Sequence, residues 1–231
     1  HSGPVVLDAK IFVGGNCVKD EAGNVYPLQK LSDGNYMFIA TDIPAFGKKE
    51  FFLDDEDMLP EPLLKQEDYS FENEYIKLDI DKENAGIWSI VLKKSGKEFV
   101  QKHEILNEYY YVSGRDPSNS SGSHLINIEL VESGPVMLSY KIELKANGIH
   151  SMTTEIRLYA GLDYVEIINT IDKEEVYEAE GVHMAFPFDI KDAGVYIDEA
   201  FAGYWCEWEQ FSGSNKNYFT ANRYIDVYNM E

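Results

Sequence analysis

The sequence predicts an all-β protein built from β-sandwiches, and three observations support this prediction. Segments of alternating apolar and polar residues recur along the 231-residue chain, separated by turns rich in Gly, Asn, Asp and Pro. The 16 Tyr and 12 Phe fit the half-buried surface of a sheet. No segment of ten or more residues carries a helical stripe, which disfavours a parallel α/β fold. We expect only one short helix, over residues 173–179.

Residues 1–66 are predicted to form a small β domain, or part of one, that ends in an acidic connector. Its strand-like segments lie at 5–13, 25–28, 36–40 and 49–53. The acidic run 54–57 is followed by Pro60 and Pro62. Like charges repel each other and prolines cannot donate hydrogen bonds to a sheet, so we place a domain boundary near residue 66.

Residues 67–231 are predicted to form a second, larger β domain. Residues 75–81 alternate in polarity, and a turn at 84–86 leads to an apolar strand at 87–92, so the two strands predict a hairpin. Further strands follow at 126–131, 136–144, 152–159, 164–171, 182–188 and 194–197. The sequence stops directly after a strand pattern at 224–228, and we therefore expect the domain to continue beyond it.

Charge and cysteine content exclude several kinds of partner and site. The chain has 41 acidic and 20 basic side chains, a net charge of −21. An acidic surface repels phosphate groups, so we expect neither nucleic acid nor a membrane as partner.

The lone pair Cys17 and Cys206 cannot form a disulfide framework. No apolar run reaches the ~20 residues of a membrane span, so we expect a soluble chain, and no sequence signal indicates its compartment.

No established catalytic or metal-binding motif is present. The chain lacks the nucleophile elbow, the dinucleotide and phosphate loops and the zinc motif HExxH. We therefore assign no catalytic residue, no metal ligand and no cofactor to this chain. The nearest acid–base pair is His183 with Glu180, which we expect to share one face of a strand.

Two segments carry the residue types that bind carbohydrate. The first is an aromatic run with two charged residues beside a long polar loop at 118–123, and its candidate contacts are Tyr109, Tyr111, Arg115 and Asp116. An aromatic ring suits the apolar face of a sugar, and fixed polar groups bind its hydroxyls. Tyrosines that pack in a sheet beside a flexible loop would explain this pattern equally well.

The second segment contains two tryptophans and two glutamates within residues 204–211. If it forms a strand, Trp205 and Glu207 share one face and Trp208 lies on the other. Trp205, Glu207 and Trp208 are therefore candidate carbohydrate contacts. A strand end that lines the core is the alternative interpretation.

The order of motifs resembles the C-terminal β region of glycoside hydrolase family 38, the α-mannosidases. The motifs are the Pro-x-Gln element that ends at Gln29, a Pro/Gly corner at 42–47, a hairpin over 72–90, and the segments 134–136, 155–159, 163–169, 185–188 and 213–227. Residues 109–117 depart from the family pattern, which indicates a divergent bacterial branch and leaves the sugar specificity open.

The resemblance implies a small β-sandwich followed by a supersandwich of the galactose-mutarotase-like type. It also implies that the zinc ligands and the aspartate nucleophile belong to an N-terminal catalytic domain of the same polypeptide. This chain would then be a non-catalytic segment of a zinc-dependent retaining α-mannosidase-like glycoside hydrolase, which supports the catalytic domain and contacts carbohydrate. Two alternatives are a free-standing carbohydrate-binding β-sandwich, with Tyr111, Trp205 or Trp208 as platform, and a mutarotase-like epimerase that uses His183 and Glu180.

Overall fold

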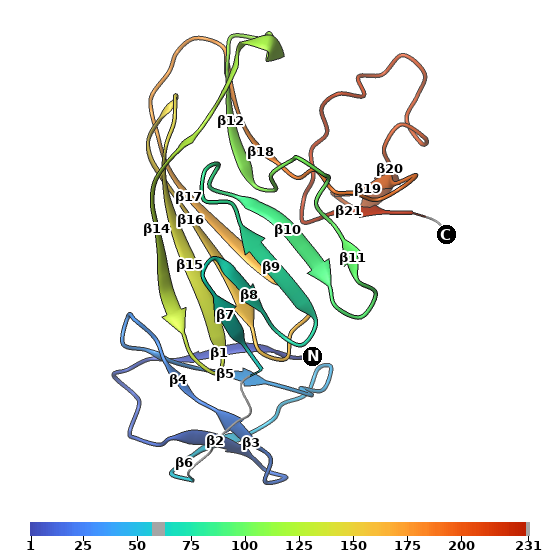
Figure 1. Ribbon diagram of the computed structural model, residues 1–231. Helices are drawn as coiled ribbons and strands as arrows, with labels where there is room; N and C mark the ends of the chain where they lie inside the picture. The colour runs from blue at the N-terminus through green and yellow to red at the C-terminus, as the bar shows by residue number, and fades with distance from the viewer. Residues whose placement is uncertain (57–62, 230–231) are drawn as a thin grey trace. The chain divides into compact units, whose positions relative to one another are not determined.

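The computed structural model describes residues 1–56 and 63–229 and confirms an all-β protein (Figure 1). The chain divides into two compact units, His1–Pro187 and Phe188–Glu231. The predicted connector includes residues 57–62, which lie outside the described residues. Within the described ranges, no helix is long and apolar enough to cross a membrane.

A small β-sandwich forms the N-terminal part of the first unit. One sheet has the strand order β1 (Gly3–Leu7), β5 (Tyr36–Ala40), β4 (Gln29–Lys30). The other has the order β3 (Val25–Pro27), β2 (Cys17–Asp20), β6 (Phe51–Asp54). Val18, Phe38 and Ala40 form its buried core, because alternate residues of the facing strands point inward.

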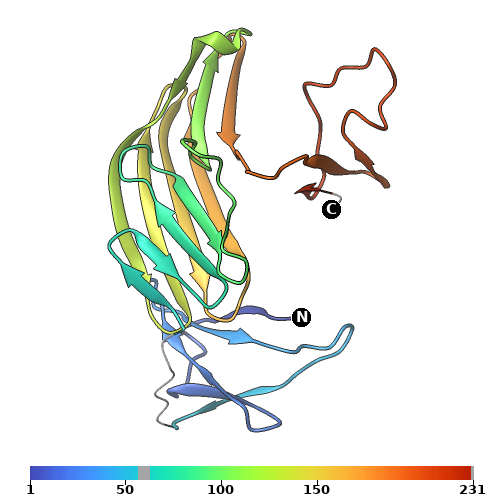
Figure 2. The ribbon, with the colours of Figure 1, turned by 45° about the vertical axis from the view of Figure 1, so that its right-hand side comes forward.

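A larger sandwich makes up the rest of the first unit, and its two layers are visible in Figure 2. One layer is the antiparallel sheet β14 (His124–Ser133), β15 (Met137–Lys145), β16 (Ile149–Tyr159), β17 (Val165–Lys173). The other layer begins with the sheet β11 (Lys97–Glu98), β10 (Ile87–Leu92), β9 (Ile76–Ile80), β8 (Ser70–Glu72), β7 (Lys65–Glu67). It continues with the sheet β13 (Ser120–Gly122), β12 (Glu108–Ser113), β18 (Glu180–Ala185).

The core of the larger sandwich follows from strand periodicity. On β16, Ile156 and Leu158 are fully buried, whereas Glu155 and Arg157 lie on the opposite face and form an ion pair. The predicted hairpin over residues 75–92 is confirmed as the pairing of β9 with β10. An isolated bridge between Ile87 and Leu106 connects the two sheets of the second layer.

The buried side chain of Gln29 joins the small sandwich to the larger one. Its Oε1 accepts hydrogen bonds from the backbone N–H groups of Val136 (3.0 Å) and Met137 (2.8 Å), and its Nε2 donates to the Met137 carbonyl (3.1 Å). A Cβ atom at Gly134 would overlap the Gln29 carboxamide, so this turn needs glycine. The Pro-x-Gln element that ends at Gln29 and the segment 134–136 therefore contact each other directly.

The helix expected over residues 173–179 is absent. β17 extends through Lys173, which pairs with Ile149 of β16, and residues 174–179 then form an irregular connection to β18. Pairing with the neighbouring strand has overridden the weak local helix preference. The one helical element among the described residues is the 3-10 turn η1 (Pro117–Asn119).

The second unit contains one antiparallel sheet with the order β20 (Ala202–Trp205), β19 (Gly194–Glu199), β21 (Ile225–Tyr228). Asp198 is buried on β19 and accepts two hydrogen bonds from the Arg223 guanidinium, at 2.8 and 3.0 Å. Arg223 lowers the pKa of the Asp198 carboxyl, which therefore stays ionised. This ion pair fixes the long connection from β20 to β21 against the central strand.

Candidate functional site

The first candidate surface begins on β12, where the tyrosines alternate between the two faces of the strand. Tyr109 points inward and is fully buried, and its hydroxyl donates to the Asn147 carbonyl at 2.8 Å. Burial raises the pKa of this hydroxyl. Tyr109 is therefore a core residue that offers no face to a ligand, unlike the exposed contact expected from the sequence.

Tyr111 lies on the same face of β12, at the end of the larger sandwich, and is half-buried. Its ring packs directly against Gly148 in the turn between β15 and β16. The neighbouring Glu180 carboxylate raises the pKa of Tyr111 and forms an ion pair with Lys173 at 2.6 Å. Lys173 in turn lowers the pKa of Glu180. Tyr111 thus has partners on several sides and only part of its ring remains open.

Arg115 and Asp116 lie in the exposed loop after β12. The Asp116 carboxylate accepts a hydrogen bond from the Ser118 N–H at 3.0 Å and caps η1, and this bond lowers its pKa. The polar loop predicted at 118–123 is ordered by η1 and by β13, which pairs with β12. A cavity of about 340 Å³ opens at this end of the sandwich, and it is lined by Ser121, Gly122, Ser123, His124, Lys145, Ala146 and Asn147.

The acid–base pair that an epimerase would require is not formed. His183 and Glu180 lie three residues apart on β18, whose pairing with β12 is regular, so they point to opposite faces. His183 lies over Gly181, whereas Glu180 binds Lys173 on the other face. The expectation that His183 and Glu180 share one face was wrong, because side chains lie on the same face of a strand only when they are an even number of positions apart.

The second candidate surface lies in the second unit and is an aromatic cluster around Trp205. The rings of Trp205 and Trp208 are stacked, with centroids 5.2 Å apart and planes 26° apart. Tyr228 and Tyr196 contact Trp205 at centroid distances of 4.8 and 5.5 Å. Trp208 remains 62% exposed, so one indole is held by its neighbours while the other is open to solvent.

Glu207 is placed beside Trp208 by a turn. β20 ends at Trp205, so the strand alternation expected for Trp205 and Glu207 is wrong. Glu207 adopts a left-handed backbone conformation (φ 69°), its N–H donates to Gln210 Oε1 at 2.9 Å, and its carbonyl accepts from Lys216 Nζ at 3.0 Å. A cavity of about 280 Å³ lies beside it, and its lining comprises Ala193, Gly194, Val195, Cys206, Glu207, Trp208 and Phe219.

Sequence reasoning missed three residues of the second surface, namely Tyr196, Tyr228 and Gly194. Tyr228 reaches Trp205 because β21 pairs with β19, and the sequence does not reveal that pairing. Gly194 makes room for the rings, because a Cβ there would lie 2.6 Å from Trp205 and 3.2 Å from Trp208. The sequence signal for this packing was Gly194 itself, a glycine at the first position of a strand that precedes Trp205 and Trp208.

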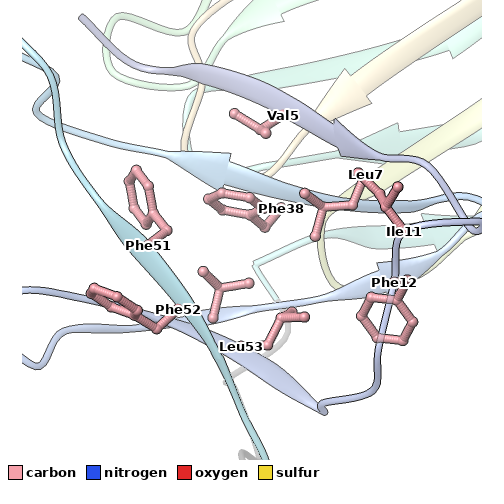
Figure 3. A pocket seen from close by; sticks show the side chains of 9 residues that line it. Val5, Leu7, Ile11, Phe12, Phe38, Phe51, Phe52 and Leu53 are labelled. Carbon is pink, nitrogen blue, oxygen red and sulfur yellow. The ribbon is translucent and has the colours of Figure 1, made fainter.

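An apolar groove in the small sandwich has the wrong chemistry for a sugar (Figure 3). It has a volume of about 370 Å³ and lies between the edge strands β1 and β6. Its lining consists of Val5, Leu7, Ile11, Phe12, Val18, Phe38, Phe51, Phe52 and Leu53. No lining side chain can orient a hydroxyl group, whereas a sugar needs fixed polar partners.

The His, Cys, Asp and Glu side chains that the structure describes do not fit a zinc ion. Among the described residues, no three His, Cys, Asp or Glu side chains come together as metal ligands. Zinc sites in proteins use three or four such ligands. No step of a zinc-dependent reaction can therefore be assigned to side chains described here.

Comparison with known proteins places the chain in a family. No curated protein matches the sequence. Residues 71–205 match the family model described as glycosyl hydrolases family 38 C-terminal domain, and this range is more than half of the chain. It begins within β8 and ends with Trp205, the last residue of β20. The chain therefore belongs to glycosyl hydrolase family 38, as a C-terminal domain of that family.

Proposed function

We propose that this chain is the non-catalytic C-terminal β region of a zinc-dependent, retaining α-mannosidase-like glycoside hydrolase. The observation that carries the proposal is the family match over residues 71–205. Motifs outside that range, the Pro-x-Gln element at Gln29 and the corner at 42–47, support it as well. The zinc ion and the nucleophile are assigned to the catalytic domain of the same polypeptide.

In this proposal the first unit, His1–Pro187, supports the catalytic domain as a rigid body. The Gln29 contacts tie the small sandwich to the hairpin between β14 and β15, and the buried Glu132 adds a hydrogen bond from the Ser32 N–H at 2.7 Å. Buried polar groups that are fully hydrogen-bonded specify one arrangement of the parts they join. The two sandwiches of the first unit would then present one continuous surface to the catalytic domain.

A second candidate function is carbohydrate binding by the β region itself. The observation that favours it is the exposed indole of Trp208 stacked on Trp205 beside Glu207. The half-buried Tyr111, with Arg115 and Asp116 in the loop that follows, is a weaker candidate, because most of its ring is covered. Carbohydrate binding is compatible with the first proposal, and it would also suit a free-standing module.

The supporting role can be tested by removing the β region from the complete polypeptide. Hydrolysis of an aryl α-mannoside should require residues 1–231, and a version without them should lose activity although it still binds zinc. Aryl α-glucoside and α-galactoside serve as controls for the sugar preference. Full activity without the β region would contradict the supporting role, and preference for another sugar would contradict the mannosidase assignment.

A further inference from the structure

The Trp208 indole is packed on one face and exposed to solvent elsewhere. The packed face stacks on Trp205, and Trp205 is itself held by Tyr228 and Tyr196. Gly194 leaves the space that both indoles occupy. A ring held in this way loses little conformational freedom when a ligand binds, so more of the contact energy contributes to affinity.

Glu207 supplies a hydrogen-bonding group at the same cavity, and its backbone is strained. Its φ of 69° is a left-handed conformation, which is unfavourable for a residue with a side chain. Glycine or asparagine would form this turn more easily. The bonds from Glu207 N–H to Gln210 and from Lys216 to the Glu207 carbonyl hold the conformation. Glu207 is exposed and lines the cavity together with Trp208.

The charges around the cavity select against anionic ligands. Residues 188–231 contain eight Asp and Glu but only three Lys and Arg. Each of these cations already contacts an acceptor: Lys216 binds the Glu207 carbonyl, Arg223 binds Asp198, and Lys191 lies 3.7 Å from Asp192. A sugar that carries a carboxylate or phosphate would be repelled by this negative surface, because the three cations already bind other acceptors.

We infer that the cavity beside Trp208 binds one ring of a neutral pyranose sugar, which stacks on the Trp208 indole and donates hydrogen bonds to the Glu207 carboxylate. This inference rests on the carbohydrate contact proposed above and names its ligand class and its two contact residues. The cavity, at about 280 Å³, is slightly smaller than typical small-molecule sites, which measure roughly 300–1,000 Å³. It therefore accepts a single ring, and the rest of an oligosaccharide would extend into solvent.

The test is a titration of the 231-residue chain, followed by tryptophan fluorescence and calorimetry. The probes are α-mannotriose, maltotriose as a second neutral trisaccharide, and trigalacturonate as the anionic one. We expect at least one neutral trisaccharide to bind and trigalacturonate not to bind. Failure of both neutral sugars at tens of millimolar, or equal binding of trigalacturonate, would overturn the inference.

Three variants localise the binding. Trp208→Ala should weaken it about tenfold, and Glu207→Gln, which keeps the size of the side chain, should weaken it by a similar factor. Phe211→Ala removes another exposed aromatic residue of the same unit, outside the cavity lining, and should leave affinity unchanged. Unchanged affinity in both Trp208→Ala and Glu207→Gln would place any binding elsewhere and overturn the inference.

The outcome is independent of the proposed supporting role. If the complete polypeptide needs residues 1–231 for hydrolysis but neither neutral sugar binds, only the sugar site is wrong. If sugar binds at Trp208 but hydrolysis does not need the β region, the supporting role is wrong and a carbohydrate-binding module remains.

Discussion

Gln29 and Asn73 are buried side-chain amides that hold distant parts of the chain together. The Asn73 Nδ2 donates to the carbonyls of Tyr159 (2.8 Å) and Leu162 (2.7 Å), and its Oδ1 accepts from the Ile76 N–H at 2.8 Å. Each amide acts as donor and acceptor at once, which neither a carboxylate nor an apolar side chain can do. Their partners lie up to 108 residues away, so their roles could not be read from the sequence, which marked them only as motif residues.

Replacing Gln29 with alanine should destabilise the first unit by about 2–4 kcal/mol. The substitution leaves the buried N–H groups of Val136 and Met137 without acceptors, and each such group costs about 1–3 kcal/mol. Urea denaturation followed by circular dichroism measures the change. Gln101→Ala, the same substitution at an exposed site, should change stability by less than about 0.5 kcal/mol. Equal effects of the two substitutions would show that the Gln29 contacts contribute nothing.

Asp20 should make the small sandwich sensitive to acid. Its buried carboxylate accepts hydrogen bonds from Asn24 Nδ2 (2.8 Å) and Tyr26 Oη (2.9 Å) and pairs with Lys49 (2.9 Å). The bond from Asn24 and then the bond from Lys49 hold the pKa of Asp20 well below its ordinary value near 4. A lowered folded-state pKa contributes stability above the unfolded-state pKa, and this contribution is lost as the pH falls below it.

Stability measured between about pH 6 and pH 2 should therefore fall less steeply in Asp20→Asn than in the unmodified chain. The variant should also be less stable at pH 7, because the ion pair with Lys49 is lost. Glu21→Gln at the exposed neighbouring position is the matched control. The same pH dependence in the unmodified chain and in Asp20→Asn would refute the role of this carboxylate.

At the level of elements, the turn between β15 and β16 is shaped by its contact with β12. Gly148 has a φ of 76°, and a Cβ there would also overlap the Tyr111 ring. Gly161, in the turn between β16 and β17, has a similar φ of 70° but open space around the Cβ position. A substitution at Gly161 therefore tests backbone strain alone, whereas a substitution at Gly148 tests backbone strain together with steric overlap.

Gly161→Ala should cost about 1–2 kcal/mol from backbone strain alone, and Gly148→Ala should cost clearly more. Chemical denaturation of both variants gives the difference. The additional loss should largely disappear when Gly148→Ala is combined with Tyr111→Ala, measured relative to Tyr111→Ala alone. Equal losses at the two glycines would mean that the Tyr111 ring moves away without cost.

Strand positions in the larger sandwich were predictable because alternation and turn residues are local signals. The expected strands at 136–144 and 152–159 correspond to β15, which is shifted by one residue toward the C-terminus, and to β16, which begins three residues earlier. The wrong predictions concern segments whose structure depends on residues distant in the sequence. β17 continues through Lys173 because it pairs with β16, and β20 ends at Trp205 where the Glu207 turn begins. The inward position of Tyr109 likewise follows from packing between layers, since alternation alone does not say which face is buried.

At the scale of the whole molecule, all-β architecture and family membership were both accessible from the sequence. The family match over residues 71–205 confirms the resemblance drawn from the order of short motifs. The two candidate surfaces were located only in part: Trp205 and Trp208 do lie together, whereas Tyr109 is buried and the His183–Glu180 pair does not exist. Whether these residues come together depends on where their side chains point at strand ends and turns. Those directions are set by contacts with segments distant in the sequence.

We propose that the catalytic centre of this glycoside hydrolase lies in the catalytic domain of the complete polypeptide and not in residues 1–231. The most direct test is turnover of an aryl α-mannoside by the purified 231-residue chain with added zinc, beside the complete polypeptide at equal concentration. We predict hydrolysis by the complete polypeptide and none above the buffer rate by the chain alone. Zinc-dependent turnover by the chain alone would contradict the account.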